Sequence, residues 1–134
     1  MMNKIFLALS AVFLAGTVLF ASPAEACRDC PFPMRIGDNT WLMPNGQVVV
    51  EIDETPASTY FVNVHVTLRD PQTNEVLAAG SARRHKTKRD LVIQLIDRGG
   101  HRVRGEIRWV DFQNSVIRAR FSCDGRCAIT KLID

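Results

Sequence analysis

Four cysteines carry the most specific chemistry in the chain, because they form two close pairs far apart in the sequence. The first pair is a Cys-x-x-Cys motif, and the second has three residues between its cysteines. Such pairs form disulfides, exchange them with other thiols, or bind a metal such as zinc. The cysteines are Cys27, Cys30, Cys123 and Cys127.

The residues that follow the first pair argue against redox catalysis. A thioredoxin-like pair needs its first cysteine at a helix N-terminus, where the dipole lowers the thiol pKa. Here Pro31-Phe32-Pro33 follows, and the two prolines disfavour a helix at this point. We therefore expect disulfides and neither a resident metal nor a cofactor. A thiol-redox or metal-handling protein that uses Cys27 and Cys30 is the second functional hypothesis.

Three disulfide pairings are open to four cysteines. Two of them tie the ends of the region 27–134 together, and closing a loop of about 100 residues stabilises a fold by roughly 4 to 5 kcal/mol. The third pairing makes two small local rings, which contribute less. On this ground we expect the end-to-end clasp.

Basic side chains supply the second kind of chemistry, since they bind anionic groups. Residues 83–89 hold five basic residues in seven positions, and we expect them to form a projecting loop between two strands. Further arginines alternate with apolar residues between Arg102 and Cys123. The candidate binding residues are Arg83, Arg84, Lys86, Lys88, Arg89, Arg104, Arg108, Arg118 and Arg120.

The segment from Arg102 to Cys123 predicts a hairpin whose register can be stated in advance. If residues whose numbers sum to 226 face each other, the apolar residues of both strands share one face. The other face then pairs Glu106 with Arg120 and Arg108 with Arg118. Like charges directly opposite each other are unfavourable, so a bound anion is one explanation for the second pair.

The charge of the chain is unevenly distributed. Residues 27–80 contain three basic and seven acidic residues, whereas residues 81–134 contain thirteen basic and six acidic ones. Such asymmetry indicates an anionic partner, and a mixed solvated surface is the alternative. A nucleic acid is disfavoured because the predicted outer face lacks aromatic residues that stack on bases.

Catalytic motifs are missing from the sequence. No serine lies in a Gly-x-Ser-x-Gly turn, and the histidines, His65, His85 and His101, are scattered over separate elements without ligand spacing. We expect that the protein is not an enzyme.

Residues 1–26 have the features of a secretory signal peptide. Lys4 precedes an apolar run, and Ala24-Glu25-Ala26 places small residues where a signal peptidase reads them. Cleavage before Cys27 would leave residues 27–134 as one domain in the periplasm or outside the cell. A cysteine at the new N-terminus is also a feature of lipoproteins. The residues before Cys27 disfavour lipidation, because they include the charged Glu25 and lack a large aliphatic side chain. No later segment has the roughly 20 apolar residues of a membrane crossing.

The remaining pattern predicts strands. Residues 39–43 and 47–52 flank the turn Pro44-Asn45-Gly46, and the strand from Tyr60 to Leu68 alternates an inward face with polar residues. The small residues of 78–82 leave room for a bulky neighbour such as Trp41 or Trp109. The sequence thus predicts an all-β fold, a single antiparallel β-sandwich of about seven strands and immunoglobulin-like type, with a small β-barrel as the alternative.

These features predict a secreted or periplasmic binding protein: an assembly factor, inhibitor or envelope-associated adaptor that recognises a protein or an anionic envelope polymer. A structural subunit of an envelope assembly is the third hypothesis. The sequence leaves the oligomeric state open.

Overall fold

The computed structural model describes residues 27–123 and residue 127. The predicted signal peptide, residues 1–26, lies outside the described residues. Eight strands form: β1 (Met34–Gly37), β2 (Thr40–Leu42), β3 (Val49–Pro56), β4 (Phe61–Arg69), β5 (Val76–His85), β6 (Asp90–Asp97), β7 (Arg102–Asp111) and β8 (Val116–Cys123). The described part of the chain has no helix long and apolar enough to cross a membrane.

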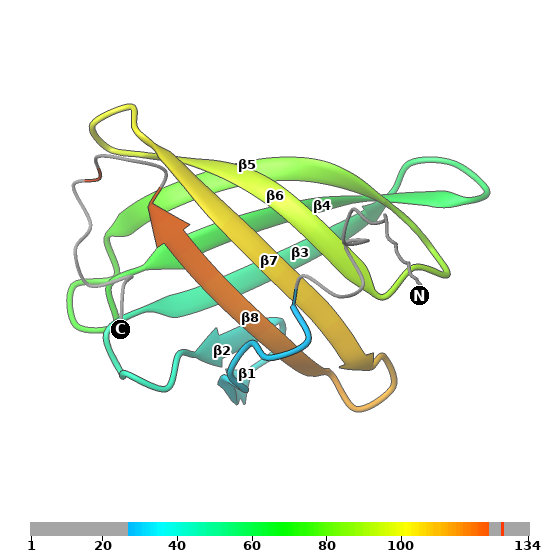
Figure 1. The fold of residues 1–134 in the computed structure, drawn as a ribbon, viewed down its shortest axis with the longest axis horizontal. Coiled ribbons are helices and arrows are strands. Elements are labelled where there is room, and N and C mark those ends of the chain that lie inside the picture. The colour runs from blue at the N-terminus through cyan, green and yellow to red at the C-terminus, as the bar shows by residue number, and fades with distance from the viewer. Residues whose placement is uncertain (1–26, 124–126, 128–134) are drawn as a thin grey trace, which may run out of the picture.

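The strands follow one another in a single antiparallel sheet with the order β1 to β8. Strands β3, β4 and β5 form one layer, and β6, β7 and β8 cross in front of it at an angle (Figure 1). The prediction of an antiparallel all-β fold is confirmed. The sheet is nearly closed, so it combines the facing layers of a sandwich with the continuous strand order of a barrel.

The core lies between these two layers and is built by the alternation that the sequence shows. Branched and aromatic residues at every second position suit a strand with one buried face. The fully buried side chains include Val50 of β3, Val64 and Val66 of β4, Leu95 of β6 and Ile107 of β7.

One predicted core residue lies outside. Tyr60 precedes β4 and is 64% exposed, so its expected inward position is wrong. Its ring stacks on that of His85 with 6.2 Å between centroids. The inward alternation begins only where β4 pairs with β5.

The fold turns from one layer to the other between β5 and β6. These strands pair only at Ala78–Asp97 and Ala79–Ile96. A Cβ on Gly80 would lie 2.3 Å from the carbonyl oxygen of Gln94, so only glycine admits the β6 backbone there. The small residues of β5 therefore make room for β6. The expectation that Trp41 or Trp109 packs against these small residues stays a prediction.

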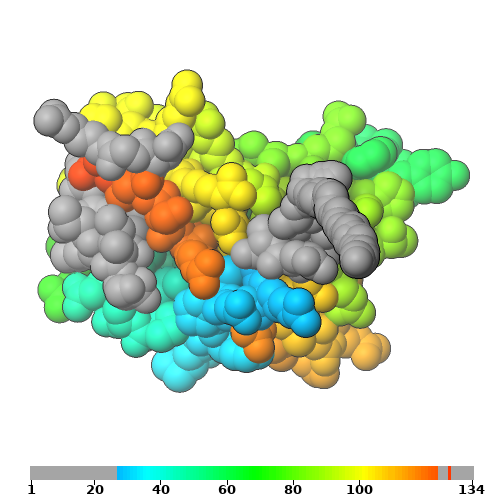
Figure 2. Space-filling view, viewed as in Figure 1, coloured from blue at the N-terminus to red at the C-terminus, as the bar shows by residue number. Residues whose placement is uncertain are grey.

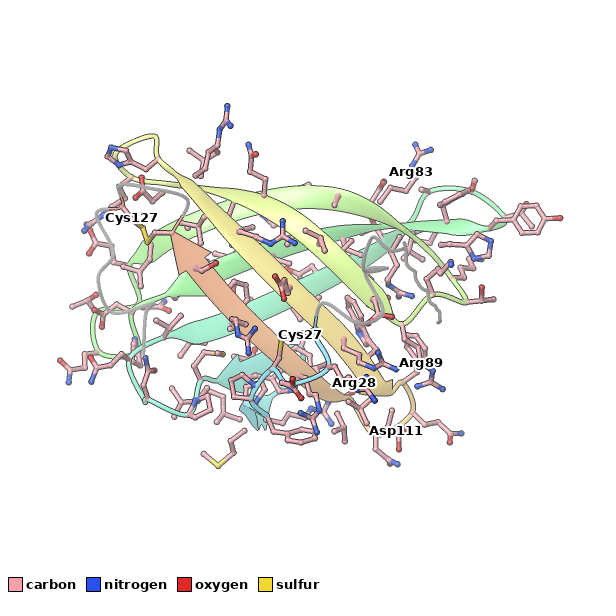
Figure 3. The ribbon with its side chains drawn as sticks, in the orientation of Figure 1. Cys27, Arg28, Arg83, Arg89, Asp111 and Cys127 are labelled. Atoms are coloured by element: carbon pink, nitrogen blue, oxygen red, sulfur yellow. A yellow bond between two sulfur atoms is a disulfide. The ribbon has the colours of Figure 1, made fainter. Side chains whose placement is uncertain are left out.

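Both disulfides are local. Cys27 bonds to Cys30 and Cys123 bonds to Cys127, so the predicted end-to-end clasp is wrong (Figure 3). The sulfur of Cys27 lies close to the carbonyl oxygens of Glu106 and Arg118, on the outer face of β7 and β8.

Geometry explains the local pairing. Cys123 is five residues beyond Arg118, which is roughly 17 Å along a strand. A disulfide requires Cα atoms within about 7 Å of each other. The N-terminal cysteines reach the middle of β8 and not its end.

Candidate anion-binding surface

The arginines of β7 and β8 lie on the outer face of the hairpin, in the predicted register. Opposing residues sum to 226 from Val103–Cys123 to Trp109–Ile117, after which the register shifts. Arg108 therefore faces Arg118 directly, as predicted. Strand β6 adds Asp90 opposite Arg108, so this row of the sheet contains two cations and one carboxylate.

The two opposed arginines, Arg108 and Arg118, each have partners within the protein. One guanidinium nitrogen of Arg108 lies 3.3 Å from Oδ1 of Asp90. Arg118 donates to the carbonyl oxygen of Cys30 at 2.9 Å, and its guanidinium lies 4.0 Å from the centre of the Phe32 ring. These contacts hold the two arginines without an external anion.

The segment after Cys27 supplies most of these acceptors. It lies against β8, as Figure 2 shows for the blue segment beside the orange strand. The amide of Ala119 donates to the carbonyl oxygen of Pro31 at 3.0 Å, and Arg120 donates to that of Asp29 at 3.3 Å. The segment thus partly covers the predicted arginine face.

Glu106 faces Arg120 in the register but forms its ion pair along its own strand. The Nε of Arg104 donates to Oε2 of Glu106 at 2.9 Å. The other carboxylate oxygen, Oε1, is buried and has no hydrogen-bond partner among the described residues. The predicted opposition of Glu106 and Arg120 is confirmed in register, although Arg104 is the partner in the ion pair.

The basic run at 83–89 is only in part a loop, so that prediction needs correction. Strand β5 continues to His85, which faces Phe61 of β4. The alternation turns Arg84 toward the core side, where it is 4% exposed. Its guanidinium pairs with Glu54 at 3.2 Å and lies 4.4 Å from the centre of the Trp109 ring.

Arg89 also forms hydrogen bonds within the protein. It donates to the carbonyl oxygens of Trp109 and Val110 at 3.1 and 2.8 Å. The exposed basic residues of the run are Arg83, Lys86, Lys88 and also Arg89, and the guanidinium of Arg83 lies over the Phe61 ring (Figure 3 labels Arg83 and Arg89).

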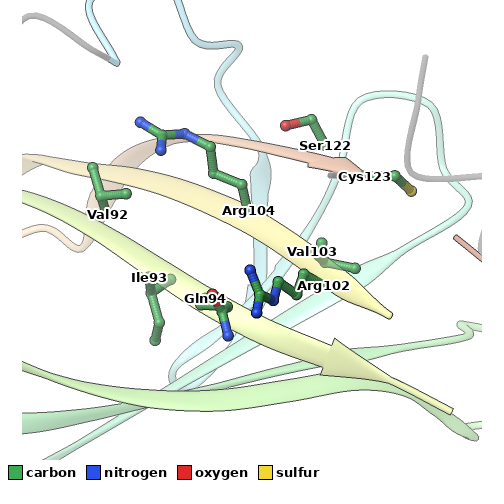
Figure 4. Close-up of a pocket in the computed structure, with 8 residues that line it drawn as sticks. All are labelled: Val92, Ile93, Gln94, Arg102, Val103, Arg104, Ser122 and Cys123. Atoms are coloured by element: carbon green, nitrogen blue, oxygen red, sulfur yellow. The ribbon is translucent and has the colours of Figure 1, made fainter. Parts of the chain in front are cut away.

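A shallow groove of about 520 Å³ crosses the outer face of β6, β7 and β8 (Figure 4). Its polar lining comes from Gln94, Arg102, Arg104 and Ser122. Both arginines are exposed, and no carboxylate of the described residues pairs with Arg102. The groove is therefore the part of the arginine face that is open to a ligand.

Two carboxyl groups near these cations have shifted pKa values. Burial raises the pKa of Asp90 above its ordinary value of 3.8, while the charges of Arg108, Lys88 and Arg89 act in the opposite direction. Hydrogen bonds from Asn114 lower the pKa of Asp111 below its ordinary value of 3.8.

No protein-family model, curated protein or solved structure matches this chain. The site is therefore defined by its own geometry.

Sequence reasoning missed part of the groove. Gln94 and Ser122 were not among the candidate residues, although the predicted register already places Ser122 opposite Arg104. Arg102 belongs to the same alternation as Arg104 and also was not selected. The register rule, extended to the ends of the strands, was the available signal.

Proposed function

We propose that this protein acts by binding, and that the outer face of β6 to β8 holds an anionic polymer of the cell envelope or the extracellular space. Two disulfides support a periplasmic or secreted location, because disulfides persist in oxidising compartments. Catalysis is not part of the proposal.

The observation that carries the proposal is the uncompensated charge around the groove. Five arginines share this face with the carboxylates of Asp90 and Glu106: Arg102, Arg104, Arg108, Arg118 and Arg120. The carbonyl oxygens that accept from Arg118 and Arg120 satisfy hydrogen-bond donors, but they are neutral and leave the positive charge in place. A field of one sign over a groove attracts anions and concentrates them there.

The spacing of the cations favours a polymer over a small anion. Residues two apart on β7 are about 7 Å apart on the same face, so Arg102 and Arg108 are separated by roughly 20 Å. A chain with repeated phosphate, sulfate or carboxylate groups contacts several of these cations at once. Lys86 and Lys88 precede β6 at the Asp90 end and extend the charge in that direction.

The binding mechanism follows from the side chains. The positive field steers the polymer to the face, and guanidinium groups then donate paired, charge-assisted hydrogen bonds to its anionic groups. Exposed Val92 and Ile96 of β6 provide apolar contacts beside the arginines.

The test uses immobilised sulfated polysaccharide and immobilised lipopolysaccharide as probes, with elution by salt. The variant Arg102→Gln/Arg104→Gln removes the two groove cations. The matched control, Arg35→Gln/Arg98→Gln, removes two exposed cations that pair with Asp38 and Glu75 away from the groove.

We expect the groove variant to elute at lower salt and to reduce the slope of log affinity against log salt by about one unit per arginine. The control should change both quantities much less. Equal losses in the two variants, or no retention of the unmodified protein on either probe, would overturn the polymer proposal. Capture of an acidic peptide without retention on either polymer would replace the polymer by a protein partner.

A further inference from the structure

A carboxylate lies beside the first cysteine pair. The sulfur atoms of Cys27 and Cys30 and a carboxylate oxygen of Glu106 all lie within 4.8 Å of one another. Both cysteines are buried, at 1% and 0% exposed, and the Glu106 side chain is 15% exposed. Two sulfurs and one oxygen thus converge on one point under the N-terminal segment.

Glu106 has an oxygen atom that the rest of the described protein does not satisfy. Arg104 donates to Oε2, whereas Oε1 is buried and lacks a donor. Leaving a buried acceptor without a partner costs about 1 to 3 kcal/mol, and more when the group is charged. Sulfur atoms in a disulfide carry no proton, so the oxidised Cys27–Cys30 pair supplies no donor to Oε1.

We propose that, once the disulfide is reduced, Cys27, Cys30 and Glu106 bind a single zinc ion. Zinc takes thiolate ligands at about 2.3 Å and carboxylate oxygens at about 2.0 to 2.2 Å in tetrahedral sites, which separates ligand atoms by roughly 3.5 to 3.8 Å. In the oxidised chain the two sulfur atoms are bonded to each other, so reduction must let them move apart to this separation, while the Glu106 oxygen, already within 4.8 Å of both, moves toward the metal. Two thiolates select zinc over calcium or magnesium, which prefer oxygen ligands.

The chemistry balances with a dithiol reductant. The reductant gives two electrons and two protons to the Cys27–Cys30 bond, becomes a disulfide itself and leaves two thiols. Zinc then displaces both thiol protons to the solvent, and water takes the fourth coordination position.

The N-terminal segment stays in place during this change because its anchors do not involve sulfur. The carbonyl oxygens of Asp29, Cys30 and Pro31 accept hydrogen bonds from β8. Reduction leaves these bonds intact, so the thiols remain over Glu106. This makes the site pre-organised for the metal.

The experiment starts from the full chain carrying Cys123→Ser/Cys127→Ser, which removes the other thiols. The protein is reduced by a water-soluble phosphine, which becomes a phosphine oxide as water supplies the oxygen and two protons. Zinc is then titrated without oxygen against a chromophoric chelator, and cobalt(II) is used in parallel as a spectroscopic probe.

We expect one zinc ion per reduced chain and none for the oxidised chain. Glu106→Gln should weaken zinc binding by at least about tenfold, since even partners of metal ligands cost 10-fold to 100-fold in affinity. Glu75→Gln is the control, because Glu75 is an exposed carboxylate paired with Arg98.

Absence of zinc binding by the reduced chain, or equal affinity of the Glu106→Gln and Glu75→Gln variants, would overturn the proposal. If Glu106→Gln does not fold, the test is the absorption spectrum of cobalt(II) bound to the reduced chain with Glu106 unchanged. Tetrahedral absorption bands with thiolate charge transfer support the site, and octahedral bands refute it.

Discussion

Arg84 provides the sharpest test of how this fold is held together. The side chain is 3% exposed, and its Nη1 donates to the carbonyl oxygens of His85, Lys86 and Lys88 at 3.2, 3.3 and 2.8 Å. Its Nη2 pairs with Glu54, and its guanidinium lies over the Trp109 ring. One cation therefore closes the β5–β6 turn and joins the two layers.

Removing this side chain leaves several groups without partners at once. Three turn carbonyl oxygens lose their donor and a cavity opens over the Trp109 ring; an unsatisfied acceptor costs about 1 to 3 kcal/mol, so we expect Arg84→Ala to lose about 2 to 4 kcal/mol. Arg84→Lys keeps the charge but not the planar fork, and we expect a loss of about 1 to 3 kcal/mol from the turn carbonyls. Glu54 is 34% exposed, so Glu54→Gln should cost about 1 kcal/mol or less.

The assay is urea unfolding without reductant, followed by tryptophan fluorescence and by circular dichroism. Arg83→Ala is the control, because Arg83 is the exposed neighbour and its guanidinium lies over the Phe61 ring. We expect it to lose about 0.5 to 1 kcal/mol. Equal losses for Arg83→Ala and Arg84→Ala would show that the buried contacts of Arg84 do not stabilise the fold, and would refute the reasoning.

Two further predictions concern the layer of β6, β7 and β8. A Cβ on Gly105 would lie 2.9 Å from Ile93 and 3.0 Å from the Phe121 ring, so Gly105→Ala should lower the free energy of unfolding by about 1 to 3 kcal/mol. At Gly37 the nearest atom is 3.9 Å away, and equal losses for Gly37→Ala would contradict the packing argument. The raised pKa of Asp90 means that the folded protein binds this proton more tightly, so its contribution to stability falls as the pH rises from 3.8 through the folded pKa. In a carboxyl NMR titration Arg108→Gln should raise this pKa further, and an unchanged or lower value would refute the role of Arg108.

The register of β7 and β8 could be predicted because two independent patterns agree on it. Shifting one strand by a single residue would turn Ile107 or Ala119 to the solvent, and only one alignment buries both sets. The hairpin of β2 and β3 was predictable for a similar reason, since Pro44-Asn45-Gly46 marks its turn. Local periodicity and turn chemistry thus define the strands.

The disulfide pairing and the place of Arg84 were not predictable from local patterns. The entropy argument favours long loops, but it does not say where the N-terminal segment lies on the sheet. The sequence predicts a loop for Arg84 because it belongs to a run of five basic residues between two predicted strands. Its burial depends on Glu54, on the ring of Trp109 and on carbonyl groups of the turn, all of which meet it only in the folded chain.

The contacts of the arginines separate two kinds of role that the sequence merges. Both terminal nitrogens of Arg84 donate to acceptors and its charge is paired with Glu54, although its buried Nε has no partner among the described residues; these contacts explain Arg84 as a structural residue. Arg118 has a neutral acceptor in Cys30, so it holds the N-terminal segment and still contributes a full charge to the outer face. Arg102 is exposed without a carboxylate among the described residues. Substituting Arg118 would therefore change folding and binding together, and Arg104 shares this difficulty because it pairs with Glu106, so Arg102 is the groove arginine whose replacement reports most directly on binding.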